Sequence, residues 1–183
     1  MDSLERAAIA RLRRGDIDGL EFLVRRYYEV ALRAAFLISR DSATAEDVTQ
    51  TAFLRAYERI GQFDSARPFR PWLMRIVVND ALMTVTRRRQ SSLNGEAEQA
   101  LDLLPSPELD PAALLAGAET KEAVWAALEH LTPGQRAVIV ARYYLGLTDT
   151  ETASHLAVPT GTVRRRLHTA RGRLRHLLPA WVR

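Results

Sequence analysis

The sequence has no cysteine, and 25 of its 26 basic residues are arginine, Lys121 being the exception. Without cysteine the chain can form no disulfide, thiolate metal site or cysteine nucleophile, which suits a reducing compartment. Its uncharged apolar runs all fall short of the ~18 residues of a membrane span. The first residues, MDSLERAAIARLRRGD, lack the apolar segment of a secretory signal. We therefore expect a cytoplasmic protein that does not insert into a membrane.

Motifs for catalysis are equally scarce. The four histidines, at positions 130, 155, 168 and 176, show no metal-ligand spacing, and no glycine-rich phosphate loop follows a strand. These absences predict a protein that is not an enzyme and that needs no metal, no cofactor and no small-molecule substrate.

Charged residues are unevenly distributed along the 183 residues. The segment 1–90 has 16 arginines and 12 acidic residues, 91–120 has six acidic residues and no basic one, and 121–183 has ten basic and four acidic residues. Two basic segments that flank an acidic one favour polyanion binding at both ends, and arginine can bind phosphate or guanine through paired hydrogen bonds. The same charges would also suit an ordinary solvated surface.

Apolar residues recur at helical spacing and no segment alternates at the period of a strand, so the predicted fold class is all-α. Helices are expected at about 3–14, 18–39, 43–60, 71–89, 120–130, 133–145, 149–156 and 160–178. Asp41 or Ser42 caps the third helix, and Pro71 suits the first turn of the fourth. Prolines, serines and acidic residues over 91–119 predict a flexible acidic linker between two small helical domains, 1–90 and 120–183.

The segment 148–167, TDTETASHLAVPTGTVRRRL, has the form of a helix-turn-helix. At ~100° per residue, one side of its second helix is apolar, through Val163, Leu167, Ala170 and Leu174. The opposite side and its flank are polar and cationic, through Thr162, Arg164, Arg165, His168, Thr169 and Arg171. The backbone N–H groups of residues 160–162 suit a phosphate. This pattern favours DNA recognition over an ordinary amphipathic helix.

The helix at 43–60 carries Asp47, Gln50, Leu54 and Glu58 in one line on the side opposite its apolar residues. A leucine exposed among polar residues indicates a protein contact, although single exposed leucines are also common on protein surfaces.

Three aromatic residues, Phe63, Phe69 and Trp72, lie near arginines after this helix. Such a mixture suits unpaired bases, which stack on aromatic rings while arginines follow their phosphates. The alternative is that Phe69 and Trp72 belong to the core, which we favour for Trp72.

Motifs that recur together in one bacterial family follow each other along the chain. The first domain contains RGD at 14–16, LVRRY at 23–27, AEDVTQTAFLRAY at 45–57, FRPWL at 69–73 and IVVN at 76–79. The second contains LTPGQR at 131–136, GTVRRRL at 161–167 and AR at 170–171. The chain thereby resembles the extracytoplasmic-function group of sigma factors, with region 2 at 1–90 and region 4 at 120–183.

The resemblance implies three interfaces. Region 2 would bind the coiled coil of the largest subunit of core RNA polymerase through Asp47, Gln50, Leu54 and Glu58. It would bind the single-stranded −10 element, with a flipped base, through Phe63, Asp64, Ser65, Phe69, Arg70, Arg75, Asn79, Arg87 and Arg88. Region 4 would bind the polymerase β flap and read the duplex −35 element through Thr160, Thr162, Arg164, Arg165, His168, Thr169 and Arg171.

The expected function is that of an alternative sigma factor, which recognises a promoter with core polymerase, promotes strand opening and starts transcription. Such a protein would lie at the nucleoid when in holoenzyme, and the resemblance leaves open an anti-sigma factor as a further partner. The family usually has aspartate where Met83 stands, and the nearby Asp80 has no assigned role. The alternative is a free-standing helix-turn-helix regulator, which leaves the Asp47 face and the aromatic–arginine loop unexplained.

Overall fold

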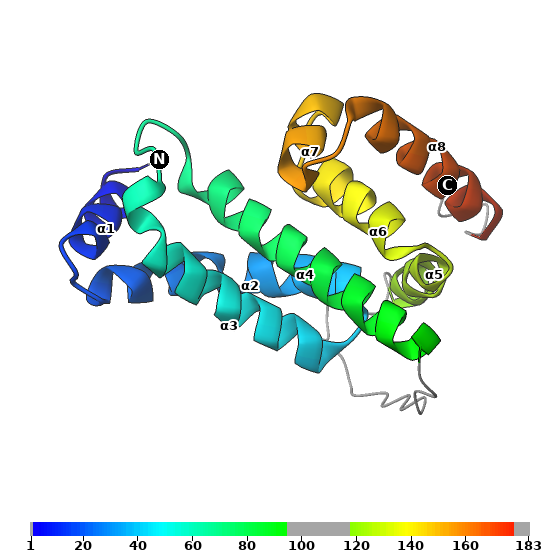
Figure 1. The fold of residues 1–183 in the computed structure, drawn as a ribbon, viewed down its shortest axis with the longest axis horizontal. Coiled ribbons are helices and arrows are strands. Elements are labelled where there is room, and N and C mark those ends of the chain that lie inside the picture. Colours follow the sequence, from blue (N-terminus) through cyan, green and yellow to red (C-terminus); the bar gives the residue numbers. More distant parts are fainter. Residues whose placement is uncertain (1, 95–117, 178–183) are drawn as a thin grey trace. The chain divides into compact units, whose positions relative to one another are not determined.

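The computed structural model describes residues 2–94 and 118–177. These residues form helices and no strand, which confirms the all-α prediction, and they group into two compact units, Met1–Thr84 and Val85–Arg183 (Figure 1). Most of the predicted linker, residues 95–117, lies outside the described residues, as does the end of the chain from 178.

The first unit contains α1 (Ser3–Arg13), α2 (Asp18–Ser39), α3 (Ser42–Glu58), the 3-10 turn η1 (Ile60–Gln62) and the start of α4 (Phe69–Asn94). Asp41 is the N-cap of α3, since its carboxylate accepts a hydrogen bond from the Thr44 N–H at 2.9 Å. The fourth helix begins two residues before Pro71 and ends five residues beyond the predicted Arg89.

Close packing between α1 and α2 depends on Gly19. A methyl group there would lie 2.3 Å from the backbone carbonyl oxygen of Ala8, so only glycine fits. The buried Tyr27 of α2 donates a hydrogen bond of 2.9 Å to the buried carboxylate of Glu5 in α1. This bond pairs two polar groups that burial would otherwise leave unsatisfied.

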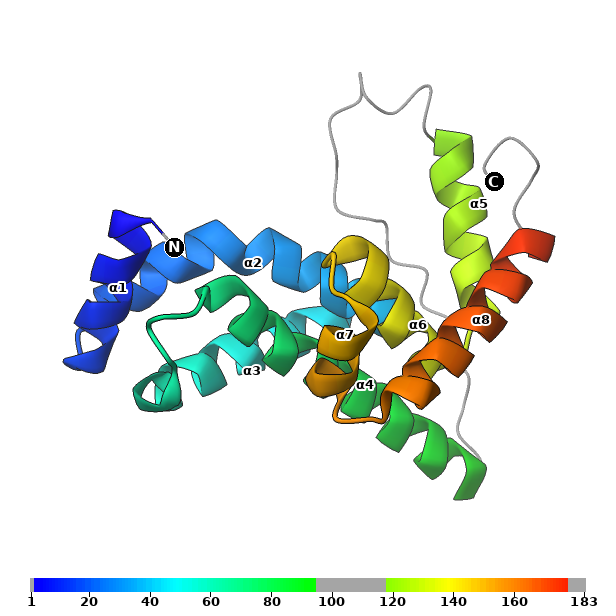
Figure 2. The same cartoon turned by 90° about the horizontal axis from the view of Figure 1, so that it is seen from above.

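The second unit contains α5 (Ala118–Glu129), α6 (Pro133–Ile139), η2 (Val140–Tyr144), α7 (Asp149–Leu156) and α8 (Thr160–Leu177). Capping boxes begin α6 at Thr132 and α7 at Thr148. Figure 2 shows α6, α7 and α8 grouped around one core, whose most buried members include Val138 and Val163.

One helix was expected over 133–145, but the structure has the α-helix only to Ile139, followed by a single turn of π-helix, η2, at Val140–Tyr144. The Leu145 N–H donates to the Val140 carbonyl at 3.0 Å, which is the five-residue spacing of that turn. Tyr143, which lies within this turn, is 59% exposed.

Candidate polymerase and nucleic-acid interfaces

Helix α8 presents two faces, as its spacing predicts. Val163, Leu167 and Ala170 are buried and Leu174 is half-buried against the rest of the unit. The predicted base-reading and phosphate-binding residues on the other side are all exposed: Arg164, Arg165, His168, Thr169 and Arg171. Burial of the apolar side therefore fixes which side chains a duplex can reach.

The start of α8 differs from the prediction in one respect. The Thr162 N–H donates to the Pro159 carbonyl at 2.9 Å, so this amide is not available to a phosphate. The Thr162 and Thr160 side chains are half-buried. Before this start, Ala157 ends α7 in the left-handed conformation, with φ 51° and ψ 44°.

The carboxylate of Asp149, the first residue of α7, lies between two arginines. It is 3.5 Å from Nε of Arg164 on α8 and 3.7 Å from Nε of Arg142 on η2. The contact places a negative charge beside the exposed Arg164 guanidinium. Asp149 was not among the predicted site residues, because α7 and α8 come together only in the fold.

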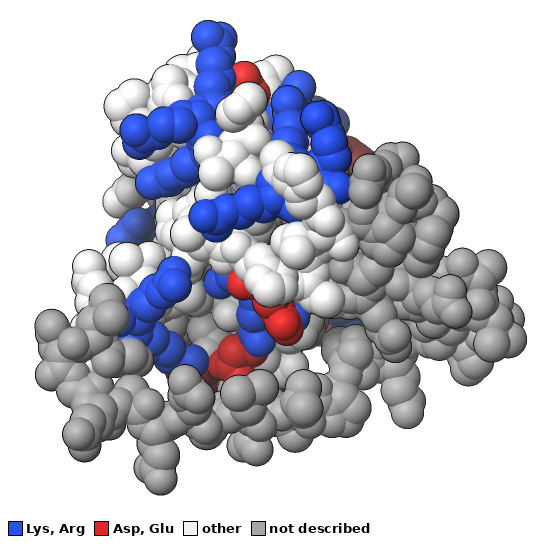
Figure 3. All heavy atoms as spheres, turned by 90° about the vertical axis from the view of Figure 1, so that its right-hand side faces the viewer, with Lys and Arg blue, Asp and Glu red and all other residues white. Residues whose placement is uncertain are grey.

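Not every arginine of α8 faces outward. The Arg173 guanidinium donates to the His130 carbonyl and to the Gln135 side-chain oxygen, both at 3.2 Å, and so fastens α8 to α6. Arg166 is half-buried and packs over Gly134. The other arginines of α8, Arg164, Arg165, Arg171 and Arg175, are exposed. On the face of the molecule drawn in Figure 3, more side chains of Lys and Arg than of Asp and Glu are visible. Such a surface attracts a polyanion.

In region 1–84, α3 exposes the predicted line of Asp47, Gln50, Leu54 and Glu58. Leu54 is 58% exposed, among the largest exposures of an apolar side chain in the described residues. The opposite side of α3 is buried through Ala45, Val48, Ala52, Phe53 and Ala56. This arrangement leaves an apolar side chain at the centre of a polar face, a pattern typical of a protein contact.

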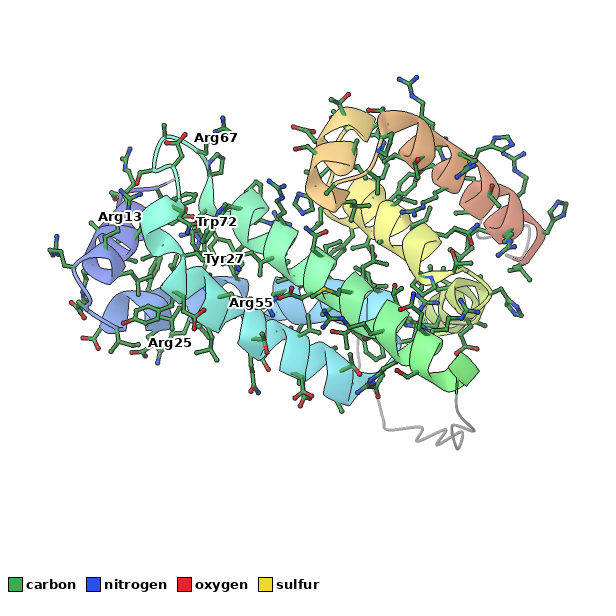
Figure 4. All side chains as sticks on the ribbon, viewed as in Figure 1. Arg13, Arg25, Tyr27, Arg55, Arg67 and Trp72 are labelled. Atoms are coloured by element: carbon green, nitrogen blue, oxygen red, sulfur yellow. The ribbon has the colours of Figure 1, made fainter. Side chains whose placement is uncertain are left out.

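The phenylalanines around the start of α4 are not exposed as base stacking in the −10 prediction requires. Phe63 and Phe69 are 2% and 0% exposed, and their ring centroids are 5.5 Å apart. Tyr27 and the half-buried Trp72 contact Phe69 at 5.9 and 5.5 Å, in the region labelled in Figure 4. Because both phenylalanines bury their rings in this cluster, neither can stack on a base in this structure, and this part of the prediction is corrected.

The loop at 63–68 nevertheless lies at the surface. The Arg13 guanidinium of α1 donates to the Phe63 carbonyl and fixes the start of the loop. Asp64 forms a turn by accepting from the Ala66 N–H at 3.0 Å. Among the residues assigned to the −10 element, the exposed ones are Asp64, Ser65, Arg70, Arg75, Arg87 and Arg88, whereas Asn79 is half-buried.

Asp80 connects the two helices that carry the region 2 surfaces. The residue is 8% exposed, and its carboxylate pairs with the Arg55 guanidinium of α3. Burial raises the pKa of the Asp80 carboxyl, and the neighbouring Arg55 opposes this rise. The role of Asp80 is therefore to hold α4 on α3.

In the described ranges 2–94 and 118–177, no helix is long and apolar enough to cross a membrane. The same ranges contain no cluster of histidine and acidic side chains that could hold a metal ion.

Comparison with known proteins identifies the family. The Sigma-70 region 2 model matches residues 23–91, and the Sigma-70, region 4 model matches residues 127–176. The ECF RNA polymerase sigma-E factor of Escherichia coli (strain K12) is 33% identical over 179 residues, covering 91% of this chain and 90% of that protein. The chain belongs to the extracytoplasmic-function group of sigma factors.

Two further comparisons place this sigma factor among its relatives. The probable RNA polymerase sigma factor RfaY of Xanthomonas campestris pv. campestris is 33% identical over 145 residues, 79% of this chain, but the chain spans only 36% of that protein. The solved structure of CnrH in complex with the cytosolic domain of CnrY matches with a TM-score of 0.63 and 27% identity, over 96% of this chain and 97% of CnrH.

The region 2 match covers most of α2, all of α3 and most of α4, and the region 4 match extends from the end of α5 into α8. A free-standing helix-turn-helix regulator would not carry region 2, so the match decides against that alternative. The exposed face of α3 and the cationic face of α8 therefore lie in the two regions that define this sigma factor.

Proposed function

We propose that this sigma factor binds core RNA polymerase and directs it to promoters with a −35 and a −10 element. The observation that carries the proposal is the division of α8 into a buried apolar side and an exposed cationic side, within a region 4 match. The polar face around Leu54, within a region 2 match, supports the polymerase contact.

The polymerase contact would use the α3 face of Asp47, Gln50, Leu54 and Glu58 on the coiled coil of the largest subunit. A side chain that is exposed in the free protein gains the most on binding, because the partner removes its whole apolar surface from water. Region 4 would bind the β flap as a second contact with polymerase.

The −35 contact would use the outward side of α8. Arg165 and His168 would read base edges in the major groove, and arginine can bind guanine through two hydrogen bonds. Thr169 donates its hydroxyl hydrogen to the Arg165 carbonyl at 3.0 Å, so it would act toward DNA as an acceptor. Arg164 and Arg171, on the flank, would hold phosphates.

The −10 contact would use the surface loop at 63–68 and the exposed side of α4. With Phe63 and Phe69 in the core, the cationic residues Arg70, Arg75, Arg87 and Arg88 would follow the phosphates of the unpaired strand, and Asn79 would contact a base. Capture of unpaired bases favours the open duplex, because the bound bases no longer pair.

The proposed protein needs no cofactor and catalyses no reaction of its own, since polymerase supplies the chemistry. It would act in the cytoplasm, at the nucleoid when in holoenzyme. CnrH is bound to the cytosolic domain of CnrY in its solved structure. By analogy, we propose that a protein partner of the anti-sigma class holds this chain when it is not bound to polymerase.

Competition for core polymerase tests the proposal. The Asp47→Ala, Leu54→Ala double variant should compete with the labelled wild type far less well, because interface anchors can contribute ~2 kcal/mol or more each. Leu4→Ala is the matched control, since Leu4 is 65% exposed on α1 and should compete like the wild type. A double variant that competes as well as the wild type would assign polymerase binding to another face.

A further inference from the structure

Tyr143 and Arg171 form an exposed pair, of which only Arg171 was among the predicted site residues. Tyr143 leaves η2 with 59% of its side chain exposed, and Arg171 lies on the flank of α8. The Arg171 Nε donates to the Tyr143 hydroxyl oxygen at 2.6 Å, and its guanidinium carbon lies 5.6 Å from the ring centroid. One arginine thus both stacks on the ring and hydrogen-bonds to its hydroxyl.

The chemistry of this pair leaves several donors for a ligand. Arginine has five N–H donors, and the contact with Tyr143 uses only the one on Nε. The Tyr143 oxygen acts as the acceptor in that contact, so its own hydrogen remains to be donated. A neutral phenol O–H and a cationic guanidinium edge beside each other match the oxygens of one phosphate.

Charge distinguishes Arg171 from its neighbour along the helix. Arg164 precedes it by seven residues, so the two side chains lie on the same flank, about 10 Å apart along the axis. Arg164 has the Asp149 carboxylate at 3.5 Å, whereas no carboxylate in the described part of the chain forms an ion pair with Arg171. The partner of Arg171 is neutral, and its full charge is therefore available to an anion.

We propose that Tyr143 and Arg171 together bind one backbone phosphate of the −35 duplex, with Tyr143 both orienting Arg171 and donating to the phosphate. Tyr143 lies within η2, and single π-helical turns are frequent at functional sites. This inference rests on the proposed function, because the duplex is the promoter that the holoenzyme would recognise.

The test uses holoenzyme and a promoter duplex recovered by the wild-type holoenzyme from genomic DNA. Each phosphate near the −35 element is replaced in turn by an uncharged methylphosphonate, and the dissociation constant is measured for the wild type and the variants. Tyr143→Phe keeps the ring and removes the hydroxyl. Tyr144→Phe is the matched control, because Tyr144 is the half-buried neighbour on the same turn.

We expect Tyr143→Phe to bind the unmodified duplex about tenfold more weakly, the loss of one hydrogen bond to a charged group. The slope of the logarithm of the binding constant against the logarithm of the salt concentration should be the same for Tyr143→Phe as for the wild type. For Arg171→Ala, which removes one phosphate contact, the magnitude of this slope should be smaller by about 0.9. One methylphosphonate position should weaken the wild type and Tyr144→Phe most. It should weaken Tyr143→Phe less, because only the Arg171 contact with that phosphate remains, and it should have little further effect on Arg171→Ala.

Three outcomes would overturn the inference. Tyr143→Phe could bind every duplex like the wild type, the two variants could lose sensitivity at different phosphates, or Tyr143→Phe could weaken core polymerase binding instead of DNA binding. Failure of the proposed function looks different: the wild-type holoenzyme then recovers no promoter at all, which overturns both proposals. In the other three cases wild-type binding to the promoter remains intact.

Discussion

Replacement of Ala157 by glycine should stabilise the second unit. Ala157 ends α7 at φ 51° and ψ 44°, a left-handed conformation that costs a residue with a Cβ about 1–2 kcal/mol and glycine almost nothing. Glycine is more flexible in the unfolded chain, which takes back about 0.4–1 kcal/mol. The Ala157 side chain is exposed, so little burial is lost. The expected net gain is about 0.5–1 kcal/mol.

Native-state hydrogen exchange of the full chain measures this gain. Amides of α7 and α8 should exchange several-fold more slowly in Ala157→Gly, whereas those of α2 and α3 in the other unit should not change. Ala126→Gly is the control: the same substitution within the right-handed helix α5, at an exposed alanine, should cost about 1 kcal/mol. If both substitutions destabilise the unit, the assignment of strain to Ala157 is incorrect.

Three further predictions concern single side chains. Arg165→Ala should change which −35 base is preferred, because an arginine that reads a base contributes ~1–3 kcal/mol of discrimination. Transcription of a randomised −35 library by the variant holoenzyme measures this, and an unchanged preference would mean that Arg165 contacts only the DNA backbone. Asn79→Ala should weaken binding of single-stranded −10 DNA more than binding of the −35 duplex; equal losses would point to misfolding. Burial and the hydrogen bond to Glu5 raise the pKa of Tyr27 from 10.0 to about 12. The contribution of Tyr27 to the free energy of unfolding should therefore be complete below pH 10 and fall by about 2–3 kcal/mol as the pH rises to about 12. Urea unfolding at increasing pH measures this loss, and Tyr27→Phe should lack it.

Local signals in the sequence predicted most helices and the two faces of α8. Helix ends are marked by effects that act within a few residues. Asp41 caps the start of α3, the ring of Pro133 suits the start of α6, and Gly146 follows η2 with a positive φ of 73°. The side of α8 that is buried follows from the spacing of Val163, Leu167 and Ala170, because a helix repeats every 3.6 residues wherever it lies.

Features that depend on distant residues were not predictable in this way. The residues next to Phe63 and Phe69 in the sequence do not distinguish a ring that stacks on a base from a ring that packs in the core. The contact that decides, between Phe69 and Tyr27 of α2, forms only in the fold. Asp80 received no role because its partner, Arg55, lies 25 residues earlier on another helix.

The exposed position of Tyr143 was not predicted for a different reason. A continuous α-helix was expected through residue 145. A π-helical turn contains one residue more than an α-helical turn, and no residue type in the η2 sequence, VARYY, marks such a turn. The exposure of Tyr143, and with it the contact to Arg171, could therefore be found only from the structure.

Run-off transcription with core polymerase and purified chain on a library of genomic fragments tests the central claim most directly. If the chain is a promoter-recognition subunit, core polymerase with it should start at discrete sites that share two sequence elements upstream, and core polymerase alone should not. The Asp47→Ala, Leu54→Ala variant should lose these starts together. A chain that binds DNA fragments but adds no start site to those of core polymerase alone would contradict the account.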